Sequence, residues 1–361
     1  MASQPTPLTE DLVRRTPKVV LHDHLDGGLR PATIIELARE LDIELPTTDP
    51  EALREWFTRG ANTGDLGSYL QGFSVTTSVM QTRDGLERVA YEALEDLHRD
   101  GVVYAEVRFA PLFHCKLGLN LEEVMDAVLS GFERAEKAHG IAWGLIVCGM
   151  RSLPPEESLR MAELAVSFRE RGCVGFDLAG DEFGHPPKEH LDAFHYCQRE
   201  NFNITVHAGE AFGPASIWQA LQYCGAHRIG HCTRLIEDMV TEGDRILKMG
   251  YLAQYILDHR IPLEVCLSSN VQTGAVKRME DHPFLLFLRY KFRVTLNTDN
   301  RLMSGVTATD ENMLACRAFG CTLDDLERLA LNGMKSAFIN YKRRCQLIFE
   351  VIKPGFNALR A

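Results

Sequence analysis

The sequence predicts an α/β fold, a (β/α)8 TIM barrel, from three observations. Eight short apolar runs recur along the chain, segments with helical spacing separate them, and polar side chains stand where several of the runs end. Continuous apolar runs are typical of strands buried on both faces, as in parallel sheets. The eight runs are residues 19–24, 102–111, 141–151, 174–181, 203–207, 228–233, 261–268 and 293–299.

The segments between the runs are expected to be helices. Residues 121–139 and 155–171 carry apolar side chains at the helical period. Pro155, followed by Glu156 and Glu157, indicates a helix start, where proline fits the first turn and acids face the positive end of the helix dipole. The longest gap, from about residue 25 to residue 100, is expected to hold a helical insertion after the first strand.

Closure of the sheet does not follow from the number of strands, because a doubly wound open sheet holds the same units. The polar strand ends favour the barrel, since TIM-barrel enzymes gather their catalytic groups at the C-terminal ends of the strands. The 361 residues contain no linker and no shift in composition. We therefore expect a single domain over residues 1–361, since parallel α/β barrels run long as one domain.

The composition of the chain limits which classes of partner and which cellular compartment are expected. Acidic residues outnumber basic ones, 50 against 39, and the formal net charge of −11 argues against nucleic acid, whose binding needs clustered Lys and Arg. No run approaches the 18 or so apolar residues of a membrane span, and the N-terminus lacks a signal-peptide pattern. The ten cysteines include no Cys-x-x-Cys pair and suit buried thiols in a reducing compartment. We expect a cytoplasmic protein without a membrane partner, with disorder confined to residues 1–9.

Two histidines end the first run. His22 and His24 are separated by one residue, so on a strand their side chains point to the same side. At the C-terminal end of a barrel strand that side faces the pocket, and both imidazoles could bind one metal ion. Taken alone, such a pair is more often one packed and one solvated histidine.

Other strand ends supply a matching set of side chains. His207 ends the fifth run, and Gly209 allows a tight turn that brings Glu210 back over the pocket. The sixth run contains His231, and the eighth ends in Asp299. Three histidines and an aspartate are a good nitrogen and oxygen set for zinc, with room left for water.

With these residues at its strand ends, the chain resembles the adenosine deaminase family (adenosine and AMP deaminases) of metal-dependent hydrolases. Five motifs carry the resemblance, in the family's order and from the first strand to the last. They are HDHLDG at 22–27, DLAGDE at 177–182, HAGE at 207–210, RIGH at 228–231 and NTD at 297–299. The resemblance therefore covers nearly the whole chain and implies a TIM barrel with one Zn²⁺ per chain.

The resemblance also implies a metal site and a reaction. The zinc ligands would be His22, His24, His207 and Asp299, with a water completing the shell. Zinc lowers the pKa of bound water from about 15.7 to about 7, which makes hydroxide available to attack C6 of a purine. His231 would orient this water, and Glu210 would give a proton to ring N1, which requires a site that keeps its carboxyl neutral. Ammonia leaves, and adenosine becomes inosine.

Recognition of the substrate is expected from other groups at the rim. The backbone N–H of Gly180 would meet ring N3, and Asp26 would accept a hydrogen bond from a ribose hydroxyl. Adenine-specific relatives tend to have glutamate in place of Asp26, which favours a nucleoside. Asn300 departs from the family, which commonly has a second aspartate there; its permanent N–H could still donate to purine N7. Asp181 is either a group that supports the site or a helix cap.

Apolar side chains are expected to cover the ribose. Leu66, Tyr69, Leu70 and Phe73 have the spacing of one helix face, which in the family forms a lid over the pocket. Plain core packing explains the same spacing equally well. Met150, at the end of the third run, is either a pocket wall or part of the core.

Several alternatives remain beside hydrolysis of adenosine and 2′-deoxyadenosine. Cytidine-type deaminases are excluded, because their zinc site needs Cys-x-x-Cys. Two-metal barrel hydrolases use a bridging lysine, which no strand end offers. A deaminase of another 6-aminopurine compound, such as aminodeoxyfutalosine or adenine, and a non-catalytic nucleoside-binding barrel remain open. The oligomeric state is expected to be a monomer or a weak homo-oligomer, and the pathway purine salvage.

Overall fold

A computed structural model of the protein describes residues 8–360, apart from the side chain of Ser68. Most of the segment expected to be disordered, residues 1–7, lies outside the described residues. Thr9 is ordered, because its side chain accepts the N–H of Leu12 and caps the first helix.

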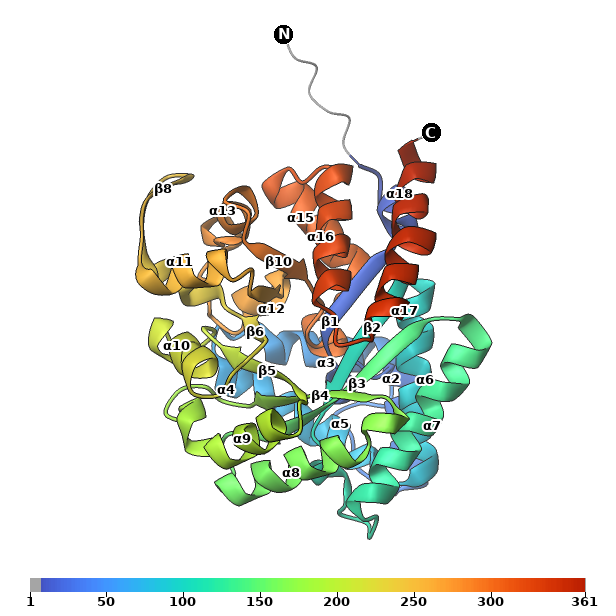
Figure 1. The fold of residues 1–361 in the computed structure, drawn as a ribbon. Helices are drawn as coiled ribbons and strands as arrows, with labels where there is room; N and C mark the ends of the chain where they lie inside the picture. The colour runs from blue at the N-terminus through green and yellow to red at the C-terminus, as the bar shows by residue number, and fades with distance from the viewer. Residues whose placement is uncertain (1–7, 361) are drawn as a thin grey trace.

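Eight parallel strands form a barrel at the centre of the molecule, with the helices around it (Figure 1). Each strand pairs with the next one in the order of this list. The strands are β1 (Lys18–His24), β2 (Val102–Phe109), β3 (Ala142–Met150), β4 (Cys173–Ala179), β5 (Asn203–Ala208), β6 (Arg228–His231), β9 (Pro262–Val265) and β10 (Arg293–Leu296).

The barrel closes between its last and first strands. Asp23 and Asp299 form a parallel bridge there. The N–H of His24 donates to the carbonyl of Asp299 at 2.7 Å, and the N–H of Asp299 donates to the carbonyl of His22 at 2.9 Å. These bonds exclude the open sheet and confirm the predicted barrel.

Helices cover the outside of the barrel. Residues 121–139 form one helix as predicted, whereas residues 155–171 divide into a helix and a 3-10 turn, η4 (Arg169–Arg171). The α-helices are α1 (Glu10–Arg15), α2 (Pro31–Glu40), α3 (Pro50–Ala61), α4 (Leu66–Tyr69), α5 (Phe73–Val79), α6 (Arg83–Arg99), α7 (Leu121–His139), α8 (Pro155–Ser167), α9 (Leu191–Arg199), α10 (Pro214–Gln222), α11 (Tyr251–Asp258), α12 (Leu267–Gln272), α13 (Phe284–Arg289), α14 (Arg301–Ser304), α15 (Ala308–Phe319), α16 (Leu323–Ser336), α17 (Tyr341–Gln346) and α18 (Lys353–Arg360).

The seventh predicted strand is shorter than expected. The apolar run at 261–268 was expected to be extended throughout, but β9 ends at Val265 and α12 begins at Leu267. The buried carboxylate of Glu311 accepts the N–H groups of Leu267 at 2.9 Å and Ser268 at 3.2 Å, which satisfies two of the free donors at the start of α12. An apolar run alone does not separate a buried strand end from a buried helix start.

The insertion between β1 and β2 is helical, as expected, and contains α2 to α6. The spacing at residues 66–73 predicted one helix face, but the segment is α4, a 3-10 turn η2 (Leu70–Gly72) and then α5. A Cβ atom at Gly72 would lie 2.8 Å from the sulfur of Met303, so glycine allows this segment to pack closely against α14.

One further element was not predicted, the antiparallel hairpin β7 (Met239–Glu242) and β8 (Arg245–Met249). Its side chains are mostly exposed, so no apolar pattern marks it. All ten cysteines are free, and none of the helices within residues 8–360 is long and apolar enough to cross a membrane.

Candidate metal and catalytic site

A cavity of about 340 Å³ opens at the C-terminal ends of the strands, between the barrel and the insertion. Thirteen of the fourteen residues predicted for the site line it, and the fourteenth, His22, is buried directly behind. The thirteen are His24, Asp26, Leu66, Tyr69, Leu70, Phe73, Met150, Gly180, His207, Glu210, His231, Asp299 and Asn300.

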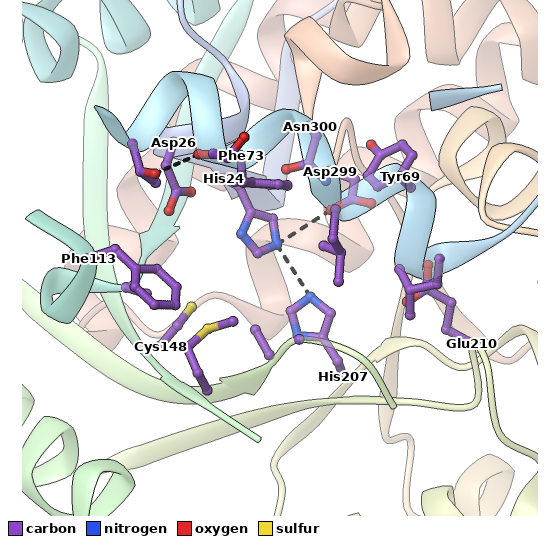
Figure 2. Close-up of a pocket in the computed structure, with 18 of the residues that line it drawn as sticks. His24, Asp26, Tyr69, Phe73, Phe113, Cys148, His207, Glu210, Asp299 and Asn300 are labelled. Carbon is purple, nitrogen blue, oxygen red and sulfur yellow. Dashed lines mark hydrogen bonds and ion pairs between the residues drawn. The ribbon is translucent and has the colours of Figure 1, made fainter. Parts of the chain in front are cut away.

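Four of these side chains converge on one point. Each of His22, His24, His207 and Asp299 offers a ligand atom, and all four atoms lie within 4.8 Å of one another. His24 Nε2 lies 3.3 Å from His207 Nε2 and 3.4 Å from Asp299 Oδ1 (Figure 2). Three strands thus supply one compact cluster of metal-ligating groups: β1 carries two of the histidines, β5 carries the third, and the aspartate follows β10.

Buried carboxylates fix which nitrogen of two histidines faces the cluster. Arg108 and Arg228 outweigh burial and hold the pKa of Glu264 well below its usual range, so it is a carboxylate. Glu264 therefore accepts the Nδ1–H of His22 at 2.9 Å, and Nε2 of His22 faces the cluster, 3.4 Å from Oδ1 of Asp299. A histidine held in this way by a carboxylate is the usual arrangement of a metal ligand.

His207 is held in the same manner. Burial alone would raise the pKa of Asp177, but the positive charges of His207 and Arg108 lower that pKa far below its usual value. The carboxylate of Asp177 accepts a hydrogen bond from Nδ1–H of His207 at 2.9 Å, which directs Nε2 of His207 toward His24. These two Nε2 atoms lie 3.3 Å apart within the same cluster, close enough to bind one cation, so the residues present fit a metal ion.

A second group of possible ligands overlaps the first. His231, Cys266 and Asp299 also lie within metal-ligating reach of one another. Burial, and then the charges of Asp299 and Glu311, raise the pKa of the Cys266 thiol well above its usual value. Because the thiolate is the ligand form, the histidine and aspartate cluster is the better metal site.

Glu210 lies beside this cluster as a neutral carboxyl. Burial, followed by the charges of Asp299 and Glu182, raises its pKa well above the usual value. Its Oε2 lies 3.4 Å from Nε2 of His231. The turn that brings Glu210 over the pocket has Gly209 in the left-handed region, at a φ of 79°, as the sequence predicted.

Glu182 holds that turn in place, a role that the sequence did not indicate. Its carboxylate accepts the N–H groups of four consecutive residues, at 2.7 to 3.0 Å. These are Gly209, Glu210, Ala211 and Phe212. The neighbouring Asp181 accepts the N–H of Phe183 within its own loop and does not cap the helical turn that follows, whose N-cap is Pro186. The position of Glu182 within the DLAGDE motif was the only signal for it in the sequence.

Polar groups at the rim are spaced around the cavity. Asp26 is buried, burial raises its pKa to about 7, and its Oδ1 has no hydrogen-bond partner in the described structure. Gly180 has a φ of 97°, and a Cβ there would lie 3.1 Å from the methyl carbon of Met150. Asn300 packs against Gly27 so closely that any Cβ at Gly27 would lie 2.0 Å from Asn300 Oδ1.

Apolar side chains form the remaining wall. Leu66, Tyr69, Leu70 and Phe73 from the insertion all border the cavity, and Met150 borders it from β3. The ring of Phe73 meets His24 edge to face, with centroids 6.4 Å apart. The hydroxyl of Tyr69 is not free, since it shares a hydrogen bond of 2.9 Å with Ser304.

Comparison with known proteins agrees with this geometry. The family model "Adenosine deaminase" matches residues 17–354. Adenosine deaminase 1 of Streptomyces coelicolor is 53% identical over 97% of this chain and 90% of its own length, and adenosine deaminase of Mycolicibacterium vanbaalenii is 50% identical over 98% and 99%. The crystal structure of an adenine deaminase from Arthrobacter aurescens superposes with a TM-score of 0.84 at 26% identity, over 96% of this chain and all of that one. The chain therefore belongs to the adenosine deaminase family.

Proposed function

We propose that this protein hydrolyses adenosine, and 2′-deoxyadenosine, to inosine and ammonia. Membership of the adenosine deaminase family, at about 50% identity to named adenosine deaminases over nearly the whole chain, supports the reaction. The observation that carries the proposal is the juxtaposition of a neutral buried acid, Glu210, with a cluster of metal-ligating groups in one cavity.

We propose Zn²⁺, one ion per chain, as the metal, held by His22, His24, His207 and Asp299. Imidazole nitrogens and a single carboxylate are typical zinc ligands. When bound, zinc would supply Lewis acidity and lower the pKa of a coordinated water to about 7, so that hydroxide forms at neutral pH. Glu264 and Asp177 support this assignment, because each keeps a histidine in the tautomer that a metal requires.

In this proposal Glu210 is the proton donor and His231 orients the attacking water. As water adds at C6, the neutral carboxyl of Glu210 would donate its proton to ring N1. One proton of the water would restore Glu210, and the other would leave with the amino group as ammonia. His231 faces the same space through Nε2, which lies 3.4 Å from Glu210 Oε2, and it orients the attacking water. A proton donor near pH 7 requires a raised carboxyl pKa, which burial provides here.

The rim residues select a nucleoside in this proposal. Asp26 Oδ1, buried without a partner, accepts a ribose hydroxyl, and the N–H of Gly180 donates to ring N3. Asn300 donates its N–H to N7. Leu66, Tyr69, Leu70, Phe73 and Met150 exclude water from the ribose, with residues of the insertion acting as the lid.

The cellular setting completes the proposal. We infer a single-domain enzyme of purine salvage in the cytoplasm, acting as a monomer or weak homo-oligomer on a small-molecule substrate. The net charge of −11 disfavours nucleic acid as a substrate.

The test is the ultraviolet change that accompanies conversion of adenosine to inosine, followed with and without a zinc chelator. We expect turnover that the chelator abolishes and that added Zn²⁺ restores. Adenine and aminodeoxyfutalosine are assayed beside adenosine. A kcat/KM for either compound above that for adenosine would overturn the substrate assignment, and full activity after complete metal removal would overturn the mechanism.

A further inference from the structure

A second cavity lies at the opposite end of the barrel from the metal cluster. It has a volume of about 460 Å³ and is bordered by the N-terminal ends of β5, β6, β9 and β10. The end of α16 and the start of α17 form its other side. The volume falls in the range of small-molecule sites, which is about 300–1,000 Å³.

Positive side chains dominate the wall of this basal cavity. No Asp or Glu is among the described residues that line it, although acidic residues outnumber basic ones in the chain by 50 to 39. Its basic residues are Arg228, Arg260, Arg293, Lys335 and Arg344.

Only one of the five is neutralised by carboxylates. Arg228 is buried, and it donates to Glu106 at 2.5 Å and to Glu264 at 2.6 Å. Its guanidinium also lies 3.5 Å from the ring centre of Phe338. The charge of Arg228 is thus neutralised by carboxylates behind the cavity wall, and its side chain forms the floor of the cavity.

The other four carry charges that no acidic side chain in the described structure balances. Arg344 donates to the carbonyls of Ala337 and Ile339 at 2.8 and 3.0 Å, and Arg260 donates to a backbone carbonyl, so neither meets a carboxylate. The side chains of Arg293 and Lys335 make no hydrogen bond or ion pair with the residues described. Burial, followed by the positive charges of Arg260 and Arg344, lowers the pKa of Arg293.

Two buried polar atoms of the wall also lack partners. Ser336 is 8% exposed, and its hydroxyl has no hydrogen-bond partner within the described residues. The same holds for Nε of Arg344. Both atoms belong to residues of the wall, and the four unbalanced cations beside them favour an anionic ligand.

We propose that the basal cavity binds the phosphate group of a small molecule, at a site separate from the catalytic one. A phosphate offers several acceptor oxygens and about two negative charges, and arginine is the side chain best suited to bind it. Arg293, Arg344 and Lys335 supply the charge. The phosphate is either free inorganic phosphate or an ester on a small organic molecule.

Isothermal titration calorimetry of the purified full chain tests this site. The ligands are inorganic phosphate, ribose 5-phosphate and ribose, at an ionic strength kept constant with NaCl. We expect one phosphate group bound per chain and no binding of ribose. Arg293→Gln and Lys335→Gln should each weaken the binding about tenfold or more, since a lost charged hydrogen bond is worth that much. Arg245→Gln, which removes an exposed arginine from the hairpin far outside the cavity wall, is the matched control.

The outcomes are separable. Equal Kd values for phosphate and its ester mean that the phosphate group alone is recognised, and tighter binding of the ester means that the cavity also contacts the organic part; both support the site. Absence of binding, binding of ribose alone, or binding that neither Arg293→Gln nor Lys335→Gln weakens would overturn it. Lys335 is exposed, so its variant tests the site even if Arg293→Gln does not fold. Deaminase turnover is read separately, because these residues lie away from the catalytic cavity.

Discussion

Asn270 and His231 are joined by a hydrogen bond of 2.9 Å in which the amide N–H of Asn270 meets Nδ1 of the imidazole. The direction of this bond follows from its neighbours. The N–H of Phe284 donates to Nδ1 of His282 at 3.0 Å, so His282 carries its proton on Nε2 and donates to Asn270 Oδ1 at 3.2 Å. Burial lowers the pKa of His282 to about 3, which keeps it neutral. Asn270 is therefore left with its N–H toward His231, and His231 carries its proton on Nε2, the nitrogen that faces Glu210.

Asn270→Asp should reverse this tautomer and slow the reaction. A carboxylate at position 270 would draw a proton onto Nδ1 of His231 and leave Nε2 as an acceptor or as part of an imidazolium. We expect kcat to fall by about 10²-fold, the lower end of what a positioned acid or base contributes. The ¹⁵N chemical shifts of His231 report the tautomer directly, so a simple loss of packing would be distinguished from a change of protonation. Unchanged ¹⁵N shifts in an otherwise folded variant would contradict the chain of bonds through His282.

The sequence was enough to predict the groups that stand at strand ends. His22, His24, His207 and Asp299 follow apolar runs, and parallel strands closed in a barrel bring their C-terminal ends together. The one alternative that remained, an open sheet, would have kept β1 and β10 at opposite edges. The hydrogen bond between His24 and Asp299 closes the barrel, and this closure brings the polar side chains at the strand ends together in one cluster.

Groups that act through another side chain could not be predicted in the same way. Glu264 lies in the middle of an apolar run and meets His22, which is 242 positions away in the chain, only across the closed barrel. Asn270 lies in a helix that begins where a strand was expected. No local pattern encodes either contact, because each depends on the lateral order of strands and on burial in the assembled core.

Glu182 is expected to be a positioning residue for Glu210. Glu182→Ala would leave four backbone N–H groups without their acceptor, and for the two buried ones, of Gly209 and Glu210, the cost is about 1–3 kcal/mol each. We expect a lower kcat with KM changed little, together with a lower Tm. Glu182→Gln keeps one acceptor oxygen and should recover part of kcat. Equal kcat values for the two variants would show that the carboxylate is not what orders the turn.

His207→Ala should strip or weaken the metal. His207 contributes one of two Nε2 atoms that lie 3.3 Å apart, and Asp177 would remain as an unpaired buried carboxylate. Elemental analysis after dialysis is expected to show a loss of zinc relative to the native protein. His195→Ala, at an exposed histidine of α9, is the matched control and should keep its zinc. A full zinc complement in His207→Ala would remove His207 from the ligand set.

Glu210→Gln should bind substrate but turn it over about 10²–10⁴-fold more slowly, because glutamine has no proton to donate. The pH dependence has a definite sign. Burial and the nearby negative charges raise the pKa of Glu210, so the carboxyl stays protonated above the pH at which an exposed glutamate ionises. The native rate should therefore fall as pH rises through that raised pKa. The residual rate of the variant should lack this decline, and a decline of the same size in both would assign it to another group.

Asn300→Asp should retain activity and make kcat/KM more dependent on pH. Asparagine keeps an N–H donor at every pH, whereas aspartate donates to N7 only while it is protonated. The position is buried and adjacent to the negative charge of Asp299, and both conditions raise the pKa of a carboxyl placed there. At low pH the variant should approach native kcat/KM, and the value should fall as pH rises and the new carboxyl ionises. The exposed Asn357→Asp change controls for the added charge and should leave the profile unchanged. If the profiles of Asn300→Asp and the native protein coincide, residue 300 does not donate to the purine.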